Sequence, residues 1–191
     1  MGGPAVLNYA PELGAREKDL IKDLYRSHYD TIYRYVFARL GKTAETEDVT
    51  SQVFLAMCRG FSVYEDRGTP FIAWLYGIAR RQVALFQRTE RMLLRSVPLE
   101  EAASAVASTD DSWDAMQRRG RRTLLIRGLG AIPEAQREVL ILRYVLSFSL
   151  AETASAMNRS EGAIKQLQTR GLASLRAKLA GDRARLELAR S

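Results

Sequence analysis

Apolar residues recur along most of the chain at intervals of three and four, the spacing of one face of an α-helix. Near the start, such a stripe comprises Leu20, Leu24, His28, Ile32 and either Tyr35 or Val36. Gly41 then follows Leu40 and suits the left-handed position that ends a helix. Strand-like alternation over four or more residues does not stand out, and no Asn-Gly or Asp-Gly hairpin turn occurs. The pattern therefore predicts an all-α fold.

A second helix is predicted to start after Thr43, because acidic residues at positions 45, 47 and 48 would fill its first turn, where the helix dipole favours anions. It should stop at Arg59-Gly60. Its apolar side consists of Val49, Val53, Phe54 and Met57. Its outward side presents Asp48, Gln52, Leu55 and Arg59. Taken by itself, this outward side is either a partner-binding face or an ordinary solvated surface.

Thr69 and Pro70 are typical of an N-cap and the first residue of a helix, and predict a third helix through Arg91. One face would carry Phe71, Trp74, Leu75, Ile78 and Leu85. Other positions carry Arg80, Arg81, Gln82, Arg88 and Arg91. Rings beside guanidinium groups are the chemistry that holds single-stranded DNA, since the cations neutralise phosphates and the rings receive unstacked bases. The alternative is that the aromatic residues simply belong to the core.

Residues 149–175 contain two short helical patterns separated at Asn158-Arg159-Ser160, the layout of a helix-turn-helix. Ser160 suits the N-cap of the second helix, and Ala154 in the first is small enough for a close helix crossing. The first pattern comprises Leu150, Thr153, Ala154 and Met157. In the second helix, the side expected to face the first consists of Ile164, Leu167, Gly171 or Leu172, and Leu175. The exposed side would present Glu161, Lys165, Gln166, Thr169 and Arg170.

These long polar side chains can reach base edges and phosphates in a major groove. An ordinary pair of packed amphipathic helices with a solvated face would have the same pattern. Both interpretations stay open on this segment alone.

Composition divides the chain into two helical blocks and a connector. We expect a first domain at residues 12–94, a flexible linker at 95–119, a second domain at 120–180 and a C-terminal tail at 181–191. The linker is rich in Ser and Ala, acidic between Glu100 and Asp114 and basic from Arg118 onward, with one short helix near Trp113. It is either a soluble spacer or a segment that occupies a basic channel on a partner. The tail is either disordered or a short helix that contacts a regulator.

The overall charge favours a polyanionic partner. The formal net charge is +7, and the 24 arginines far outnumber the 5 lysines. Arginine is the better bidentate partner for phosphate and guanine. The apolar content of 47% is enough to bury a core.

Several classes of protein are excluded by what the sequence lacks. A single cysteine and a single histidine exclude an internal disulfide and most metal sites, and we expect no metal and no cofactor. Cys58 and His28 both lie in apolar helical patterns, where packing is the better interpretation. No apolar run approaches the length of a membrane span and no signal peptide is visible, so we expect a cytoplasmic protein without membrane insertion. Catalytic motifs are not found either, and we expect no enzymatic activity.

Four segments in order make the chain resemble a known family. They read AETEDVTSQVFLAMCRGF, FIAWLYGIARRQVALFQR, LGAIPEAQREVLILRYVLSFSLAETASAM and EGAIKQLQTRGLASLR. Together they are similar to the extracytoplasmic-function (ECF) sigma factors, small two-domain members of the sigma-70 family that direct bacterial RNA polymerase to promoters. The likeness covers about residues 18–179. It implies a region 2 helical bundle and a region 4 helix-turn-helix.

The resemblance also implies partners and site residues. Docking on the clamp helices of the polymerase largest subunit is implied for Asp48, Gln52, Leu55 and Arg59. Capture of the melted minus-ten element is implied for Phe61, Tyr64, Trp74, Arg80, Arg81, Gln82 and Arg88. Reading of the duplex minus-thirty-five element is implied for Arg159, Ser160, Glu161, Lys165, Gln166, Thr169 and Arg170. The flap of the second-largest polymerase subunit, promoter DNA and an anti-sigma factor are the further partners it implies.

The chain departs from the family pattern in its recognition helix and in its second helix. Gln166 and Leu167 stand where many relatives have a small residue and an arginine, and Ser51 and Val53 replace residues that are often polar. A competing interpretation is a stand-alone helix-turn-helix regulator, which would need to self-associate to read paired half-sites. Such a regulator has no need to expose the arginine-rich third helix, and weak DNA binding restored by core polymerase would favour the sigma factor.

Overall fold

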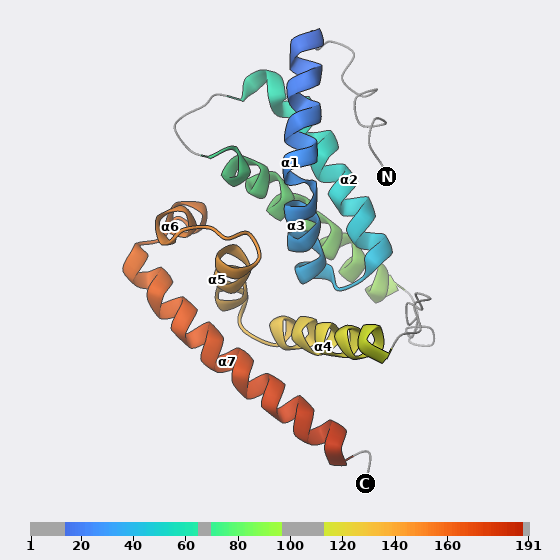
Figure 1. The fold of residues 1–191 in the computed structure, drawn as a ribbon, viewed down its shortest axis with the longest axis vertical. Coiled ribbons are helices and arrows are strands. Elements are labelled where there is room, and N and C mark those ends of the chain that lie inside the picture. Colours follow the sequence, from blue (N-terminus) through green and yellow to red (C-terminus); the bar gives the residue numbers. More distant parts are fainter. Residues whose placement is uncertain (1–13, 65–69, 97–112, 189–191) are drawn as a thin grey trace. The chain divides into compact units, whose positions relative to one another are not determined.

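A computed structural model of the chain describes residues 14–64, 70–96 and 113–188. Its contacts divide the chain into two compact units, residues 1–105 and residues 106–191. Every regular element in the described ranges is helical, as the hydrophobic spacing predicted (Figure 1). The expected flexible linker lies largely outside the described residues.

Unit 1 is built from three long helices that all contact one another (Figure 1). They are α1 (Ala15–Leu40), α2 (Thr43–Gly60) and α3 (Phe71–Ser96), and a short 3-10 helix, η2 (Phe61–Val63), follows α2. Helix α1 ends because Gly41 adopts a left-handed conformation with φ of 75°, which lets its amide donate to the Phe37 carbonyl. The predicted C-cap at Gly41 is confirmed.

The core of unit 1 is rich in aromatic side chains. Tyr35 of α1 and Tyr76 of α3 are fully buried and meet edge to face with ring centroids 5.3 Å apart. The predicted apolar face of α2 is confirmed, since all four of its members are buried. Around them the core is completed by Ile21, Ile32, Val36, Leu75, Ala79 and Val83. An aromatic core of this size favours a rigid scaffold for the surfaces that it supports.

Three details of the predicted helices in unit 1 are wrong. The buried residue at the start of α1 is Ile21 and Leu20 is half-exposed, whereas Ile32, Tyr35 and Val36 of the predicted stripe are buried as expected. Helix α2 begins at Thr43 itself, and Lys42 occupies the N-cap position. On α3, Leu85 is exposed, because the buried side of this helix includes Leu75 but is turned away from the rest of the predicted face. The predicted cap Thr69 lies outside the described residues.

The described part of unit 2, residues 113–188, consists of four helices (Figure 1). They are α4 (Trp113–Gly130), α5 (Glu134–Tyr144), α6 (Leu150–Met157) and α7 (Glu161–Leu188). The helix predicted near Trp113 is 18 residues long, so the expected boundary at residues 119–120 falls within it. Helix α7 continues beyond the expected end of the domain, and the start of the tail is therefore helical.

Two small aliphatic clusters hold unit 2 together. Val139, Ala154 and Ile164 join α5, α6 and α7, with partly buried Leu150, Met157 and Leu167 around them. The second cluster comprises Leu129, Ile132 and Leu140, against which Leu172 and Leu175 pack. The prediction that Leu172 and Leu175 face the first helix of the motif is therefore wrong, because α7 outruns the eight-residue α6 and packs its later turns on α4 and α5.

Glycines allow α7 to approach its neighbours closely. A Cβ at Gly171 would lie 3.2 Å from the Gln136 carbonyl oxygen of α5. A Cβ at Gly128 of α4 would lie 2.9 Å from Leu175 Cδ1. The first contact is with backbone, whereas the second is with the end of a flexible side chain. Helix α7 is therefore held at a short distance from α5 along its middle turns.

Candidate nucleic-acid interfaces

Local hydrogen bonds determine where the helix-turn-helix bends. The Ser149 hydroxyl accepts from the Glu152 amide at 3.1 Å, and the Ser149 amide donates to the Glu152 carboxylate at 2.6 Å. The hydrogen bonds to Ser149 lower the pKa of the Glu152 carboxyl. This reciprocal cap fixes the start of α6. At its other end Asn158 is left-handed, with φ of 51°, and ends the helix.

The predicted N-cap of the second helix is confirmed. The Ser160 hydroxyl accepts a hydrogen bond from the Ala163 amide at 3.2 Å. Ile164 is fully buried against Ala154, which confirms the close crossing expected at this small residue. The turn and the crossing together set the angle at which α7 leaves α6.

The outer side of α7 is exposed as predicted. The exposed residues there are Glu161, Lys165, Gln166, Thr169 and Arg170, and Arg159 and Ser160 are exposed just before them. At about 100° per residue, these side chains cover one side of the helix opposite Ile164 and Leu167. The Thr169 hydroxyl donates to the Lys165 carbonyl oxygen at 3.1 Å, so its proton is engaged and its oxygen can act only as an acceptor.

Tyr144 and Gln168 form a polar contact at the edge of this surface that sequence reasoning missed. Gln168 Nε2 donates to the Tyr144 hydroxyl oxygen at 2.9 Å and joins the end of α5 to α7. The Tyr144 side chain is 58% exposed. The two residues lie 24 positions apart, and only the packing of α5 on α7 brings them together. No local sequence signal marks the pair.

Four aromatic rings cluster where α2 and η2 meet the start of α3. The ring centroids of Tyr64 and Trp74 are 4.8 Å apart, those of Phe71 and Trp74 are 5.3 Å apart, and Phe61 stacks on Tyr64 at 6.3 Å. All four are half-buried. Trp74 thus packs against its neighbours and is also partly exposed, so both interpretations of the aromatic residues stay open.

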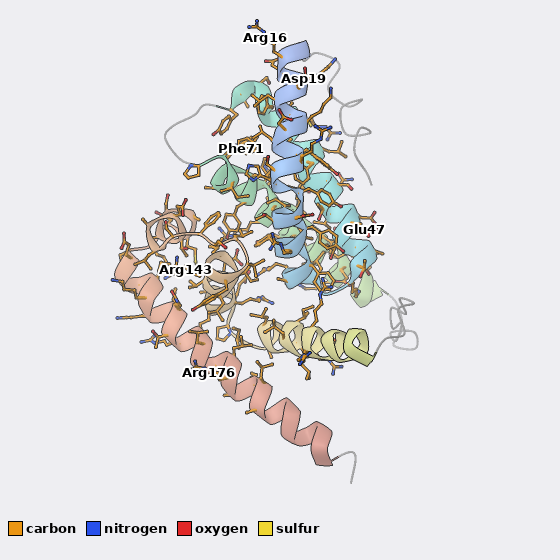
Figure 2. All side chains as sticks on the ribbon, in the orientation of Figure 1. Arg16, Asp19, Glu47, Phe71, Arg143 and Arg176 are labelled. Carbon is orange, nitrogen blue, oxygen red and sulfur yellow. The ribbon has the colours of Figure 1, made fainter. Side chains whose placement is uncertain are left out.

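Two neighbours hold this aromatic cluster in place. The His28 ring of α1 lies 5.6 Å from the Phe71 ring, and burial lowers the pKa of His28. Gly60 faces the Trp74 ring so closely that an added Cβ would lie 3.4 Å from it. Figure 2 shows Phe71 at the start of α3, beside α1. The predicted packing of His28 is confirmed, although its neighbour Phe71 belongs to the candidate site as well as to the core.

The arginines of α3 do not all lie on the same side. Trp74, Arg81 and Arg88 recur every seven residues and therefore form one outward stripe. Both arginines are exposed on the side opposite the buried Leu75 and Val83. Arg80 is exposed too, but on a different side of the helix from Trp74, and Gln82 is half-buried. The aromatic cluster thus continues into a stripe with two cations.

The predicted docking residues share one face of α2. Asp48, Gln52 and Arg59 are exposed, and Leu55 is half-exposed between them. Their spacing of four, three and four places them on the solvent side of the helix. The face is mixed in charge with one apolar centre, so the structure leaves both a partner-binding face and a solvated surface open.

Three further features of the described residues concern metal binding, membrane insertion and the single cysteine. No group of three or more metal-ligating side chains occurs in residues 14–64, 70–96 and 113–188. None of the helices in these ranges has the length and hydropathy to span a membrane. Cys58 is buried in α2, and burial raises the pKa of its thiol.

The two units correspond to two family models. The model described as sigma-70 region 2 matches residues 24–92 of unit 1. The model described as sigma-70, region 4 matches residues 128–177 of unit 2. A three-helix unit followed by a helix-turn-helix unit, matched in this order, defines a sigma factor of the sigma-70 type.

Two similar proteins identify the group of sigma-70 factors to which the chain belongs. The ECF RNA polymerase sigma factor BldN of Streptomyces coelicolor is 36% identical over 171 residues, which are 90% of this chain and 64% of BldN, so the chain spans just under two thirds of that relative. The ECF RNA polymerase sigma factor SigD of Mycobacterium tuberculosis is 31% identical over 179 residues, 91% of this chain and 84% of SigD. The chain belongs to the ECF sigma factors, as the resemblance of its sequence implied.

A solved structure has the same fold. The sigma factor RpoE of Bartonella quintana, in complex with the anti-sigma factor NepR, superposes with a TM-score of 0.64 at 20% identity. The match covers 85% of this chain and 98% of that chain. At this level of identity the likeness supports the all-α architecture alone.

Proposed function

We propose that the chain binds core RNA polymerase in the cytoplasm and directs it to specific promoters, reading the minus-thirty-five element as duplex and the melted minus-ten element as single strand. The observation that carries this proposal is the presence of two chemically different candidate nucleic-acid surfaces on one chain. Exposed polar side chains on a helix suit the edges of stacked base pairs. Half-exposed rings beside cations suit unstacked bases.

In the upstream contact, α7 would lie in the major groove. Lys165 and Arg170 donate to guanine or to phosphates, and Gln166 both donates and accepts, so it can pair with adenine. Thr169 is exposed and its hydroxyl proton is bonded to its own helix, and its methyl group suits a thymine methyl. Because Gln166 stands where many relatives carry a smaller residue, we propose that the preferred upstream sequence differs from theirs.

In the downstream contact, the aromatic cluster of unit 1 would receive bases extruded from the non-template strand. Extrusion costs a few kcal/mol for each unstacked base, which stacking on Tyr64 and Trp74 would offset. Arg81 and Arg88 would follow the phosphates of the same strand along α3. A surface that binds only the melted form shifts the equilibrium of the duplex toward opening.

Binding to the polymerase would use the outward face of α2. Asp48 and Arg59 at its two ends could pair with charged residues of the clamp helices of the largest subunit, with Leu55 buried between them. Unit 2 would rest on the flap of the second-largest subunit. Anti-sigma factors bind RpoE in the solved complex, and we include such a factor among the proposed partners of this chain.

Substitutions on α7 test the upstream contact. With reconstituted holoenzyme, Lys165→Ala should reduce promoter-specific transcription and flatten the salt dependence of promoter binding by roughly one unit of slope. Lys178→Ala is the matched control, because it removes the same charge from another side of the same helix. Equal losses in the two variants would reject base reading by this face.

Substitutions on α3 test the downstream contact. At saturating holoenzyme, Arg81→Ala should lower the yield of open complexes on duplex promoter more than on a template that is already melted. Arg80→Ala removes an arginine from a different side of α3 and should have the smaller effect. The same loss for Arg81→Ala on both templates would contradict a role in opening.

The competing function, a regulator that acts without polymerase, is separated by a binding assay. The sigma factor hypothesis expects weak duplex binding by the chain alone and specific binding after core polymerase is added. Tight, specific binding by the chain alone would favour the regulator. Promoter-specific transcription from a random promoter library, with core polymerase as the only other protein, would then identify the sequence that is read.

A further inference from the structure

Tyr144 has an unusual position for a large aromatic side chain. It is the last residue of α5 and is 58% exposed, although it lies next to the candidate recognition helix. Its hydroxyl oxygen accepts a hydrogen bond from Gln168 Nε2 at 2.9 Å. A phenol hydroxyl accepts with its lone pairs and donates with its single proton. The bond from Gln168 therefore leaves that proton available for a different acceptor.

Helical geometry places this hydroxyl at the rim of the exposed side of α7. Gln168 comes one residue before Thr169 and three residues after Lys165, so at about 100° per residue it flanks the side that carries both. When a helix occupies a major groove, the groups that flank its exposed side approach the phosphates that border the groove. The acceptor nearest to Tyr144 would then be a phosphate oxygen.

The end of α5 is also held rigidly. The Arg143 guanidinium donates to the Phe148 carbonyl oxygen across the turn that leads into α6. Backbone bonds from Leu146 to Ile141 and from Phe148 to Leu142 close the same turn. The hydroxyl is thus positioned before any DNA binds, which lowers the entropy that is lost on binding.

We propose that Tyr144 is a DNA-backbone contact of this chain: its hydroxyl donates to a phosphate oxygen beside the upstream element, and Gln168 orients that hydroxyl by occupying its acceptor side. The inference rests on the proposed function of α7. It adds a phenol hydroxyl from α5 to a surface otherwise formed by α7 and the turn before it. A phosphate contact of this kind sets the register of α7 in the groove and carries no base preference itself.

Salt dependence distinguishes this contact from a cationic one. A neutral donor releases no counterion when it meets a phosphate, whereas a lysine or arginine does. Promoter binding by reconstituted holoenzyme would be measured by fluorescence anisotropy at several salt concentrations. Tyr144→Phe, which removes only the hydroxyl, should weaken binding about five- to tenfold at every salt concentration, with the slope of the wild type. Lys165→Ala should instead flatten the slope.

A second variant tests the role of Gln168. Gln168→Leu removes the donor and should weaken binding less than Tyr144→Phe, because the hydroxyl remains but is no longer oriented. The double variant should bind no more weakly than Tyr144→Phe alone, since the two residues act through one proton. Additive losses would contradict this coupling. Tyr144→Phe and Gln168→Leu both lose the bond between α5 and α7, so a purely structural role would weaken binding equally in the two variants, whereas the proposed contact weakens it more in Tyr144→Phe.

The outcomes separate the inference from the function on which it rests. If wild-type holoenzyme binds equally well with and without the upstream element, and Lys165→Ala changes nothing, the proposed function of α7 fails. If the wild type and Lys165→Ala behave as proposed but Tyr144→Phe matches the wild type, only the role of Tyr144 is overturned. A flattened slope in Tyr144→Phe would also overturn it, because the lost contact would then be ionic.

Discussion

In unit 1 the candidate base-binding rings of Tyr64, Phe71 and Trp74 are half-buried and pack on His28 and Gly60, so that the site merges with the core. In unit 2 the candidate base-reading side chains of α7 are exposed, and the hydrophobic clusters lie on the opposite side of the helix. One site is therefore a part of the packing of its unit. The other is a surface that the packing only supports.

This difference follows from the two kinds of ligand. An unstacked base has two flat π-faces that have lost their stacking neighbours, and a preformed aromatic surface can replace those neighbours. A base pair that stays stacked offers only hydrogen-bonding edges, and these are reached by long polar side chains. We expect function and stability to be linked in unit 1 and separable in unit 2.

The largest expected effect is the destabilisation of unit 2 while unit 1 keeps its stability. Ile164 of α7 is fully buried against α5 and α6. Ile164→Ala should therefore lower the stability of unit 2 by about 3 kcal/mol, because burial is lost and a cavity remains. Binding to the upstream element should fall with it. Circular dichroism would detect a separate, earlier melting transition.

The single cysteine of the chain gives this experiment an internal control. Cys58 is buried in unit 1 and reacts with a thiol reagent only when that unit opens. In Ile164→Ala, the rate of Cys58 labelling under native conditions should equal that of the wild type. Faster labelling would mean that the two units unfold together, and the comparison between them would lose its basis.

A second prediction concerns the linked site of unit 1. Trp74→Ala removes a half-buried ring and should lower stability by about 2 kcal/mol, less than the 3–5 kcal/mol typical of a fully buried Trp. The same variant should bind the non-template strand more weakly. Lys165→Ala, the counterpart in unit 2, should leave the melting temperature unchanged while reducing upstream binding. Trp74→Ala with wild-type stability would show that the ring lies outside the packing.

Two helix ends were predicted correctly, because their signals are local. Gly41 and Ser160 act at the positions expected from their residue types. The exposed side of α7 was also predicted correctly, since hydrophobic spacing within one helix determines it. These features depend on residues that are close in the chain.

What the sequence left open depends on contacts between distant segments. Leu20 and Ile21 are adjacent and equally apolar, and only the packing of α1 on its neighbours selects Ile21. The Tyr144–Gln168 bond requires α5 to lie against α7 at a particular height. Phe71 was assigned to a core face, and its contact with Tyr64 depends on how the start of α3 packs beside η2. Periodicity contains no information on any of these.

A third prediction tests the close approach of α7 to α5. Gly171→Ala places a methyl group 3.2 Å from the Gln136 carbonyl oxygen, and backbone must move to relieve this contact. The expected loss in stability is about 1 kcal/mol, because crowding outweighs the gain in helix propensity. In Gly128→Ala the added methyl meets only side-chain atoms, of Leu175 and Leu179, which can move, so the change in stability should be close to zero. Thermal melting of both variants decides between them.

Because α7 carries the proposed reading surface, Gly171→Ala should also tilt that surface relative to α6. Upstream binding should fall further than the loss in stability alone explains. Gly128→Ala, which leaves the α5 contact intact, should bind as the wild type does. Equal binding by the two variants would indicate that the angle of α7 does not depend on this crossing.

The smallest expected effect is a dependence of unit 1 on pH. His28 is the only histidine of the chain, and burial against Phe71 lowers its pKa, because the charged imidazolium loses water. The unfolded chain, with an ordinary pKa of about 6.5, therefore takes up a proton at a higher pH than the folded chain does. Stability from the neutral ring is complete above about pH 6.5 and is lost as the pH falls toward the lowered pKa of the folded state. His28→Asn should remove this dependence of stability on pH between pH 7.5 and 5.5. Thermal unfolding of both proteins at the two pH values measures the difference. If the wild type had the same pH dependence as His28→Asn, the His28 ring would lie in water, apart from the aromatic cluster.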